Sequence, residues 1–275
     1  YGGYHYHSQS GSRIWLWINN STNPAIEISD CTFEYAFGTA IYYDDIMHNA
    51  TPVITNNIIN NCPVGIHLRG SGTTTATITD NIISGSSNSG IKVQDRTVNI
   101  IGNALNQCGT GVSLDNAVAT IYDNSITNST SYPLIQLNNA LPTYLNNTIT
   151  GSGPSAIGIG GTISANRTLS NLQNMGLVYA VISDIIIASG ATLTIEAGTI
   201  IKFEYRTTTT RLTIIVNGRI NPQGTASNNV IFTSLRDDSV GGDDNMDGSA
   251  TRPAPGDWGC IQINSTNNNL EHCTF

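Results

Sequence analysis

The chain has 275 residues, a formal net charge of −8 and only 11% charged side chains. Because nucleic-acid binding needs a basic surface, this composition argues against a nucleic-acid partner. The sequence contains 36 Ile, 33 Thr, 32 Asn and 27 Gly but only 2 Lys and 5 Glu, so residues typical of strands and turns replace those typical of surface helices. We therefore expect an all-β fold. No apolar run approaches the roughly 18 residues of a membrane span, so we also expect no such span.

A six-residue phrase recurs along the first half of the chain: apolar, any residue, usually Asn or Asp, Asn, any residue, apolar. Its second polar position falls at intervals of 24, 22, 21 and 23 residues, and a related phrase extends the series back to Cys31; the five positions are Asn57, Asn81, Asn103, Asn124 and Asn147. A second phrase of the type Gly-Ile-x-Leu follows, as at residues 65–68 and 90–93. Very short strands repeated with a period of about 21–25 residues predict the coils of a solenoid.

The repeated asparagines predict an internal ladder. At a sharp bend between strands Asn tolerates the left-handed backbone region, and its amide can hydrogen-bond to the Asn of the next coil. The alternative is that Asn only marks exposed turns. The apolar residues that flank the Asn keep the same offsets in every copy, which favours the ladder.

The second half of the chain changes in character from about Leu177. Its characteristic segments are residues 189–203 (SGATLTIEAGTIIKF), 216–220 (VNGRI) and 231–234 (IFTS). Together with the Asn repeats, they resemble bacterial secreted and cell-surface domains of the right-handed parallel β-helix family, the fold group that includes pectate lyases and polygalacturonases. The resemblance implies one continuous right-handed parallel β-helix at an extracellular or cell-surface location, with Asn-ladder coils in residues 1–176 and coils like those of a domain start in residues 177–275.

The two ends of the sequence read as adjacent coils. Residues 270–275 running into Tyr1 parallel residues 28–33, and residues 258–267 parallel residues 15–23. We therefore expect a subunit or tandem-repeat unit of a fibre or adhesin that self-associates head to tail, since an uncapped solenoid exposes strand edges. The alternative is a chain cut at arbitrary points.

The five cysteines contain no CxxC pair, which argues against a zinc site. Cys31 and Cys273 hold equivalent positions in the two parallel segments, so across a head-to-tail junction they would lie roughly 4.8 Å apart. That separation allows an intermolecular disulfide. We expect Cys62, Cys108 and Cys260 to be free, buried thiols.

Residues 237–257 form an acidic segment that contains 6 of the 14 Asp. Asp243, Asn245 and Asp247 alternate and are followed by Gly248, a spacing that resembles a calcium-binding loop, although Ala254 stands where such a loop supplies a glutamate. The predicted oxygen ligands of a calcium ion are therefore Asp237, Asp238, Asp243, Asn245, Asp247 and Asp257. The alternative is a solvated acidic loop without a metal.

A second function remains open, that of a carbohydrate-active enzyme or carbohydrate-binding module resembling polysaccharide lyases. Strand alternation would place one row of side chains from successive coils on an outer face, and those that could carry acid–base chemistry or bind glycans are Asp44, His67, Arg69, Lys92, Asp95 and Arg96. This row mixes charges as an ordinary solvated face does, and the sequence lacks the Asp-rich or Gly-His-Gly signatures of the β-helix hydrolases. We therefore expect a structural role rather than catalysis.

Overall fold

The computed structural model describes residues 14–19, 25–45, 50–71, 74–207 and 209–275. In this part of the chain the only helical element is the short 3-10 helix η1 (Gln173–Met175), and all named strand pairings are parallel. None of its helices is long or apolar enough to span a membrane. The chain forms two compact units: unit 1 runs to Leu134 and includes Ala140–Ser152, and unit 2 contains Ile135–Asn139 and Gly153–Phe275.

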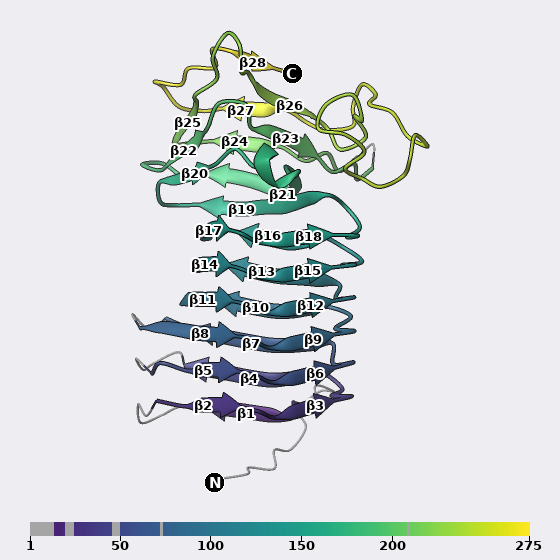
Figure 1. The fold of residues 1–275 in the computed structure, drawn as a ribbon. Coiled ribbons are helices and arrows are strands. Elements are labelled where there is room, and N and C mark those ends of the chain that lie inside the picture. The colour runs from purple at the N-terminus through teal and green to yellow at the C-terminus, as the bar shows by residue number, and fades with distance from the viewer. Residues whose placement is uncertain (1–13, 20–24, 46–49, 72–73, 208) are drawn as a thin grey trace. The chain divides into compact units, whose positions relative to one another are not determined.

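Unit 1 is a parallel solenoid in which successive coils add one strand to each of three sheets (Figure 1). Sheet A contains β1 (Leu16–Asn19), β4 (Thr39–Asp45), β7 (Val64–Gly70), β10 (Ser89–Gln94) and β13 (Thr110–Asp115). Sheet B contains β2 (Glu27–Ser29), β5 (Val53–Thr55), β8 (Thr75–Thr79), β11 (Thr97–Ile101), β14 (Val118–Tyr122) and β17 (Leu141–Leu145). Sheet C contains β3 (Thr32–Glu34), β6 (Ile58–Asn60), β9 (Ile82–Ser84), β12 (Ala104–Asn106), β15 (Ser125–Thr127) and β18 (Thr148–Thr150).

The core of unit 1 consists of columns of β-branched and Leu side chains. Strand alternation turns every second residue inward, and the parallel register places equivalent residues of successive coils on one another. In sheet B, for example, Ile54, Ile78, Ile100 and Ile121 are in register and fully buried. No single coil could shelter these side chains, so the repeat folds only as a stack.

The predicted Asn ladder is present between sheets B and C. Each amide nitrogen donates to the Oδ1 of the next Asn, with distances of 3.0 Å for Asn57 to Asn81, 2.9 Å for Asn81 to Asn103 and 3.0 Å for Asn103 to Asn124. Asn124 donates to Asn147 in the same way at 3.0 Å. The amides also donate to a carbonyl oxygen of the preceding coil, so these buried side chains are well satisfied.

The left-handed bend lies one residue before the ladder position, which corrects the expectation that the ladder Asn itself takes this conformation. At these bends the residues with positive φ are Asp30, Asn56, Asp80, Gly102, Asp123 and Asn146, with φ between 54° and 68°. These small or Asx residues tolerate the left-handed region. The ladder Asn can therefore keep an ordinary backbone and use its side chain entirely for hydrogen bonding.

Unit 2 is also built from parallel strands. Its main stack contains, in hydrogen-bonded order, β16 (Leu134–Leu137), β19 (Ala156–Ile163), β21 (Val178–Ile187), β23 (Ile200–Phe203), β26 (Val230–Ser234) and β28 (Cys273–Thr274). β21 also pairs with β24 (Ile214–Val216), which pairs with β27 (Ile261–Ile263). A third stack contains β20 (Arg167–Leu169), β22 (Thr192–Ile195) and β25 (Arg219–Pro222). The acidic segment connects β26 to β27.

Candidate functional site

The acidic segment of unit 2 brings only part of the predicted calcium ligand set together. The carboxylates of Asp238, Asp243 and Asp247 supply oxygens that lie within 4.8 Å of one another. Asp243 also accepts hydrogen bonds from the backbone N–H groups of Asp247 and Gly248, at 3.1 and 2.8 Å, so the loop closes around it. One oxygen of Asp238 is enclosed and has no hydrogen-bond partner among the described residues. This oxygen-only cluster has the donor chemistry that calcium prefers.

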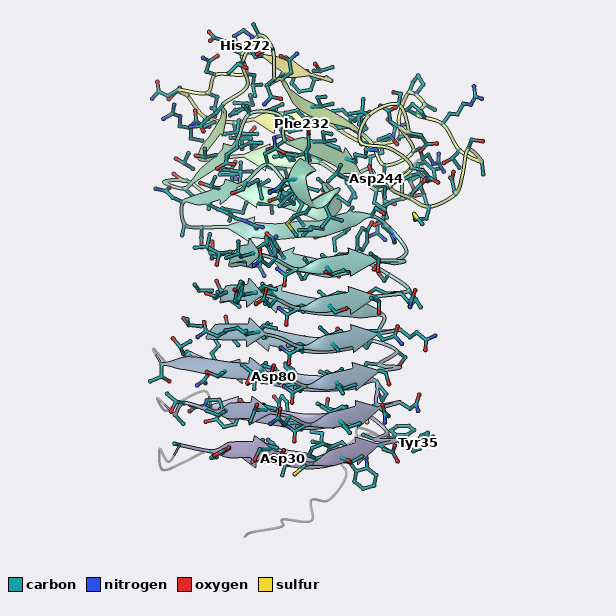
Figure 2. The ribbon with its side chains drawn as sticks, viewed as in Figure 1. Asp30, Tyr35, Asp80, Phe232, Asp244 and His272 are labelled. Carbon is teal, nitrogen blue, oxygen red and sulfur yellow. The ribbon has the colours of Figure 1, made fainter. Side chains whose placement is uncertain are left out.

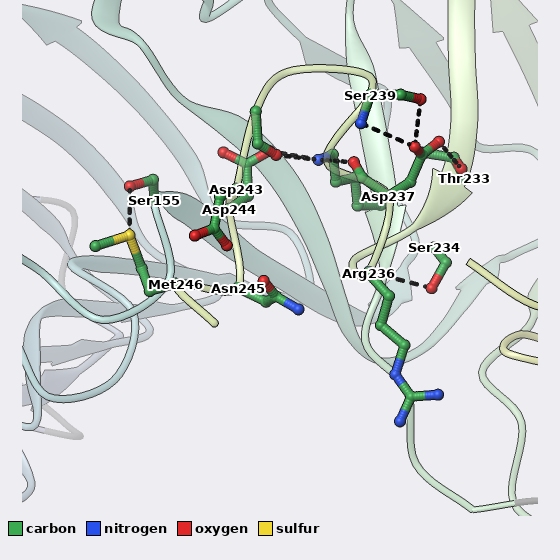
Figure 3. A network of polar contacts seen from close by, with 12 residues as sticks. Ser155, Thr233, Ser234, Arg236, Asp237, Ser239, Asp243, Asp244, Asn245 and Met246 are labelled. Carbon is green, nitrogen blue, oxygen red and sulfur yellow. Dashed lines mark hydrogen bonds and ion pairs between the residues drawn. The ribbon is translucent and has the colours of Figure 1, made fainter. Parts of the chain in front are cut away.

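The other predicted ligands have different partners. Asp237 accepts hydrogen bonds from Thr233, at 2.7 Å, and from Ser239 (Figure 3). Asp257 is buried and accepts a hydrogen bond from the Ser234 hydroxyl at 2.7 Å. The Asn245 amide nitrogen donates to Asp247 at 2.9 Å. In this arrangement these three side chains shape the loop.

Hydrogen bonding keeps two of these carboxylates in their charged form. Burial opposes ionisation of Asp237, but the hydrogen bonds from Ser239 and Thr233 outweigh it and lower the pKa of the carboxyl. The hydrogen bond from Thr251 lowers the pKa of Asp247. Hydrogen bonds to an ionised carboxylate favour that form, so the loop stays acidic near neutral pH.

A buried lysine that the sequence analysis did not identify anchors this loop. Lys202 of β23 is fully buried, and its Nζ lies 2.6 Å from Oδ2 of Asp244. The same Nζ donates to the carbonyl oxygens of Asp237, at 2.7 Å, and Gly242, at 3.0 Å. All three ammonium protons therefore have an acceptor in the loop.

A second set of contacts holds the far end of the loop. Arg236 lies 3.3 Å from the carboxylate of Asp257, and its guanidinium lies over the Tyr205 ring at 3.6 Å from the centroid. Trp258 stacks on the buried Phe203 with a centroid distance of 4.4 Å. These contacts attach the loop to unit 2 at both ends.

The outer face of sheet A in unit 1 carries a row of aromatic and polar side chains. Trp17, Tyr42 and His67 are in register, with ring centroids 6.2 Å apart for the first pair and 4.8 Å apart for the second. His67 shares a hydrogen bond with Gln94 at 2.8 Å. Burial is the main cause that lowers the pKa of His67 to about 4, so its ring is neutral at neutral pH.

Beside this row, Asp44 and Arg69 occupy paired positions of β4 and β7. The Tyr42 hydroxyl donates to one oxygen of Asp44 at 3.2 Å, while the other oxygen is enclosed without a hydrogen-bond partner among the described residues. Next to Arg69, a pocket of about 360 Å³ is lined by Arg69, Gly70, Ser71, Asp95 and Asn116. A tyrosine, a histidine and a carboxylate, which are groups able to exchange protons, thus share one face with a guanidinium that stays charged.

Not every residue predicted for this face lies on it. Arg96 is buried, with its NH1 3.4 Å from the carboxylate of Asp45. Asp95 adopts a left-handed bend and accepts a hydrogen bond from Asn116 at 2.7 Å. Lys92 does take the outward position that the alternation predicts, in register with His67. The expectation for Arg96 was wrong because strand alternation ends at the bend, where the chain turns this side chain inward.

The cysteines follow the sequence-based expectations only in part. Cys62 and Cys108 are buried free thiols as expected, but Cys260 is exposed. Cys31 enters the ladder, since its backbone N–H donates to Asn57 Oδ1 at 3.1 Å. Cys273 instead begins β28 and pairs with Val230 of β26. The two residues share the preceding left-handed bend, at Asp30 and His272, but not the ladder position.

Models of two protein families match this chain. A right handed beta helix region matches residues 64–195, and a pectate-lyase like beta helix domain matches residues 161–271. The chain has the right-handed parallel β-helix fold that both models describe. Comparison of this β-helix protein with curated proteins and with solved structures gave no match. Because one fold hosts many functions, the fold alone does not specify an activity.

Proposed function

We propose that this β-helix protein is a structural subunit, or one unit of a tandem array, of an extracellular or cell-surface fibre or adhesin. The observation that carries the proposal is the face of the first described coil. Among the described strands, β1, β2 and β3 each pair on one side only, with β4, β5 and β6. Unpaired parallel strands in register are templates for further strands.

Exposed aromatic side chains accompany these open edges. Trp15, Tyr35 and Phe37 are 62%, 71% and 68% exposed, and Figure 2 shows Tyr35 at the outer edge of the ribbon. Tyr35 also has a positive φ of 54°, where the equivalent positions of later coils carry Asn61 or Gly85. Exposed apolar surface of this kind marks association sites in soluble proteins.

Unit 2 carries a comparable surface. β27 pairs only with β24, and β28 pairs only with β26, among the described strands. Phe275 is 63% exposed and stacks on the buried Phe232 with a centroid distance of 5.4 Å. A coil from a second copy could extend both the strand pairing and the aromatic stack, which supports head-to-tail association. The part of the predicted junction formed by residues 1–13 lies outside the described residues.

Electron microscopy and light scattering of the purified chain test this proposal. We expect filaments whose length grows with protein concentration. Phe37→Lys should shorten or abolish them, because it places a charge on the open face. The matched control is Ile82→Lys, which changes a side chain that is 53% exposed on β9, a strand paired on both sides. Dispersed monomers at high concentration of the wild-type chain would contradict the proposal.

A second candidate is carbohydrate binding or catalysis on the outer face of sheet A. It is favoured by the enclosed, unpartnered oxygen of Asp44 beside Tyr42 and Arg69. Release of reducing or unsaturated sugars from acidic polysaccharides is the test. Asp44→Asn should abolish turnover, whereas Asp30→Asn, at an exposed bend outside this face, should not. Absence of both turnover and glycan binding by the wild-type chain would exclude this function.

We also propose that the acidic loop binds calcium through Asp238, Asp243 and Asp247. The convergence of three carboxylates within 4.8 Å supports this, because like charges at that distance repel one another unless a cation lies among them. Calcium would supply a rigid cross-link for the exposed part of the loop. Lys202 and Arg236 would still hold its ends.

A further inference from the structure

The pair formed by Lys202 and Asp244 is enclosed on all sides. The two side chains are 0% and 3% exposed, and Lys202 is one of only 2 lysines in the chain. A Cβ placed on Gly241 would lie 3.0 Å from Oδ2 of Asp244 but also 2.9 Å from Val178 Cγ1 and 3.5 Å from Ile200 Cδ1, so the carboxyl group lies among aliphatic side chains. An amine and a carboxyl group are therefore in contact where water is excluded.

The hydrogen bonds around Nζ orient the amine toward this carboxyl group. The amine donates two hydrogen bonds, to the carbonyl oxygens of Asp237 and Gly242, and its third proton is directed at the carboxylate of Asp244. Burial disfavours both charges of such a pair. If the third proton passes to Oδ2, a neutral amine remains whose lone pair is directed at a neutral carboxylic acid.

We propose that Lys202 and Asp244 condense to form an intramolecular isopeptide bond. The Nζ lone pair forms a bond to Cγ of Asp244, and the bond from Cγ to the protonated oxygen breaks. The departing hydroxyl takes one proton from Nζ and leaves as water, so the products are one amide and one water molecule. The step consumes no oxidant, reductant or other co-reactant. The remaining amide N–H keeps one of the two carbonyl acceptors.

The bond would close the loop covalently onto β23. It would join the strand to the start of the acidic segment, which the contacts at Asp237 and Gly242 already hold in place. This inference does not depend on fibre formation, on calcium or on any activity of the outer face of sheet A. It concerns the folded chain alone.

Intact-mass measurement of the denatured full chain tests the inference. We expect the wild-type mass to be lower than the sequence mass by one water molecule. Lys202→Arg keeps the positive charge and the ion pair but has no comparable nucleophile, so it should show the full sequence mass. Asp244→Ala should do the same. A wild-type chain with its full sequence mass would overturn the inference.

Tryptic digestion identifies the residues between which the water molecule was lost. An isopeptide bond blocks cleavage after Lys202, so we expect residues 168–206 joined to residues 237–275, the latter uncut because Pro253 follows Arg252. Residues 203–206 should be absent as a free peptide. A dehydrated chain that trypsin still cleaves after Lys202 has lost its water elsewhere, for example at Asp247 and Gly248, and would also overturn the inference.

Discussion

Arg96 forms a buried ion pair with Asp45, reaching past strand β7 to do so. NH1 of Arg96 lies 3.4 Å from Oδ2 of Asp45, and both side chains are fully buried. The intervening residue is Gly70, where a Cβ would lie 2.2 Å from the carbonyl oxygen of Asp45 and 3.2 Å from NH1 of Arg96. The guanidinium also lies over the Tyr43 ring at 5.3 Å. Because Gly70 has no side chain, Arg96 and Asp45, which belong to the coils on either side of it, can form an ion pair.

We predict that Arg96→Leu destabilises unit 1 strongly. Removing one partner leaves Asp45 buried without its counter-charge, which costs about 3–5 kcal/mol in comparable cases. Urea unfolding followed by circular dichroism measures the change. The control is Arg69→Leu, because Arg69 is exposed and should contribute little. Equal stabilities of the two variants would contradict this role of the ion pair.

The Asn ladder predicts that replacing Asn103 costs much more stability than replacing Asn99, which lies close to it in sequence. Asn103→Leu removes the oxygen that accepts hydrogen bonds from the side-chain amide and the backbone N–H of Asn81. It also removes the amide that donates a hydrogen bond to Asn124. We expect a loss of about 1–3 kcal/mol for each buried group left unsatisfied. Asn99→Leu, at a partly exposed outward position of β11, is the control and should change stability little. Calorimetric melting of both variants is the measurement, and a ladder without energetic importance would give similar melting temperatures.

His67 predicts a pH dependence of stability. Its pKa is about 4 in the folded chain against an ordinary value of 6.5. Between these values the unfolded chain binds a proton that the folded chain does not, so the free energy of unfolding falls as the pH drops through this window. Urea unfolding at pH 7 and at pH 5.5 measures this fall in the free energy of unfolding, and the fall should be smaller in His67→Gln than in the wild-type chain. His272→Gln, at an exposed site, should not reduce it. If the free energy of unfolding of His67→Gln falls with pH as much as that of the wild-type chain, other groups cause the pH dependence.

Calcium binding can be measured independently of fibre formation. We expect isothermal titration calorimetry to detect calcium binding by the full chain, and chelation to increase protease cleavage within residues 237–257. Asp243→Asn should weaken binding at least tenfold, since it removes one of three converging charges. Asp123→Asn, at an exposed bend of unit 1, supplies the control. Protease sensitivity that is indifferent to calcium would indicate a loop held only by Lys202 and Arg236.

The predicted disulfide between Cys31 and Cys273 depends on head-to-tail contact. Cys31 is exposed and Cys273 partly so, which leaves both thiols accessible to a second copy. We expect air-oxidised material to show covalent oligomers on non-reducing gels that vanish on reduction. Cys31→Ser should abolish them, whereas Cys62→Ser should not, because Cys62 is buried. Covalent oligomers that persist in Cys31→Ser would require another pair.

Much of unit 1 could be predicted from its sequence because the information is local and repeated. The interval between asparagines gives the length of a coil, and period-two alternation separates inward Ile78 from outward Thr79. The outward positions of Tyr42, His67 and Lys92 follow from the same alternation. The left-handed bends could not be placed as reliably, since Asn56 and Asn57 look alike in sequence and only the first has a positive φ.

By itself, the sequence determined that the chain is a parallel solenoid, where the ladder runs and which segment gathers the carboxylates. Only the tertiary structure decided which of these carboxylates converge and which charged residues become buried. Lys202 lies between the inward-facing Ile201 and Phe203 of its strand, so alternation places it on the outer face. It is enclosed because a loop about forty residues later in the sequence folds over it. Arg96 is enclosed because Gly70 leaves room. Both outcomes depend on contacts between coils, whereas hydrophobic periodicity reports only which face of its own strand a residue occupies.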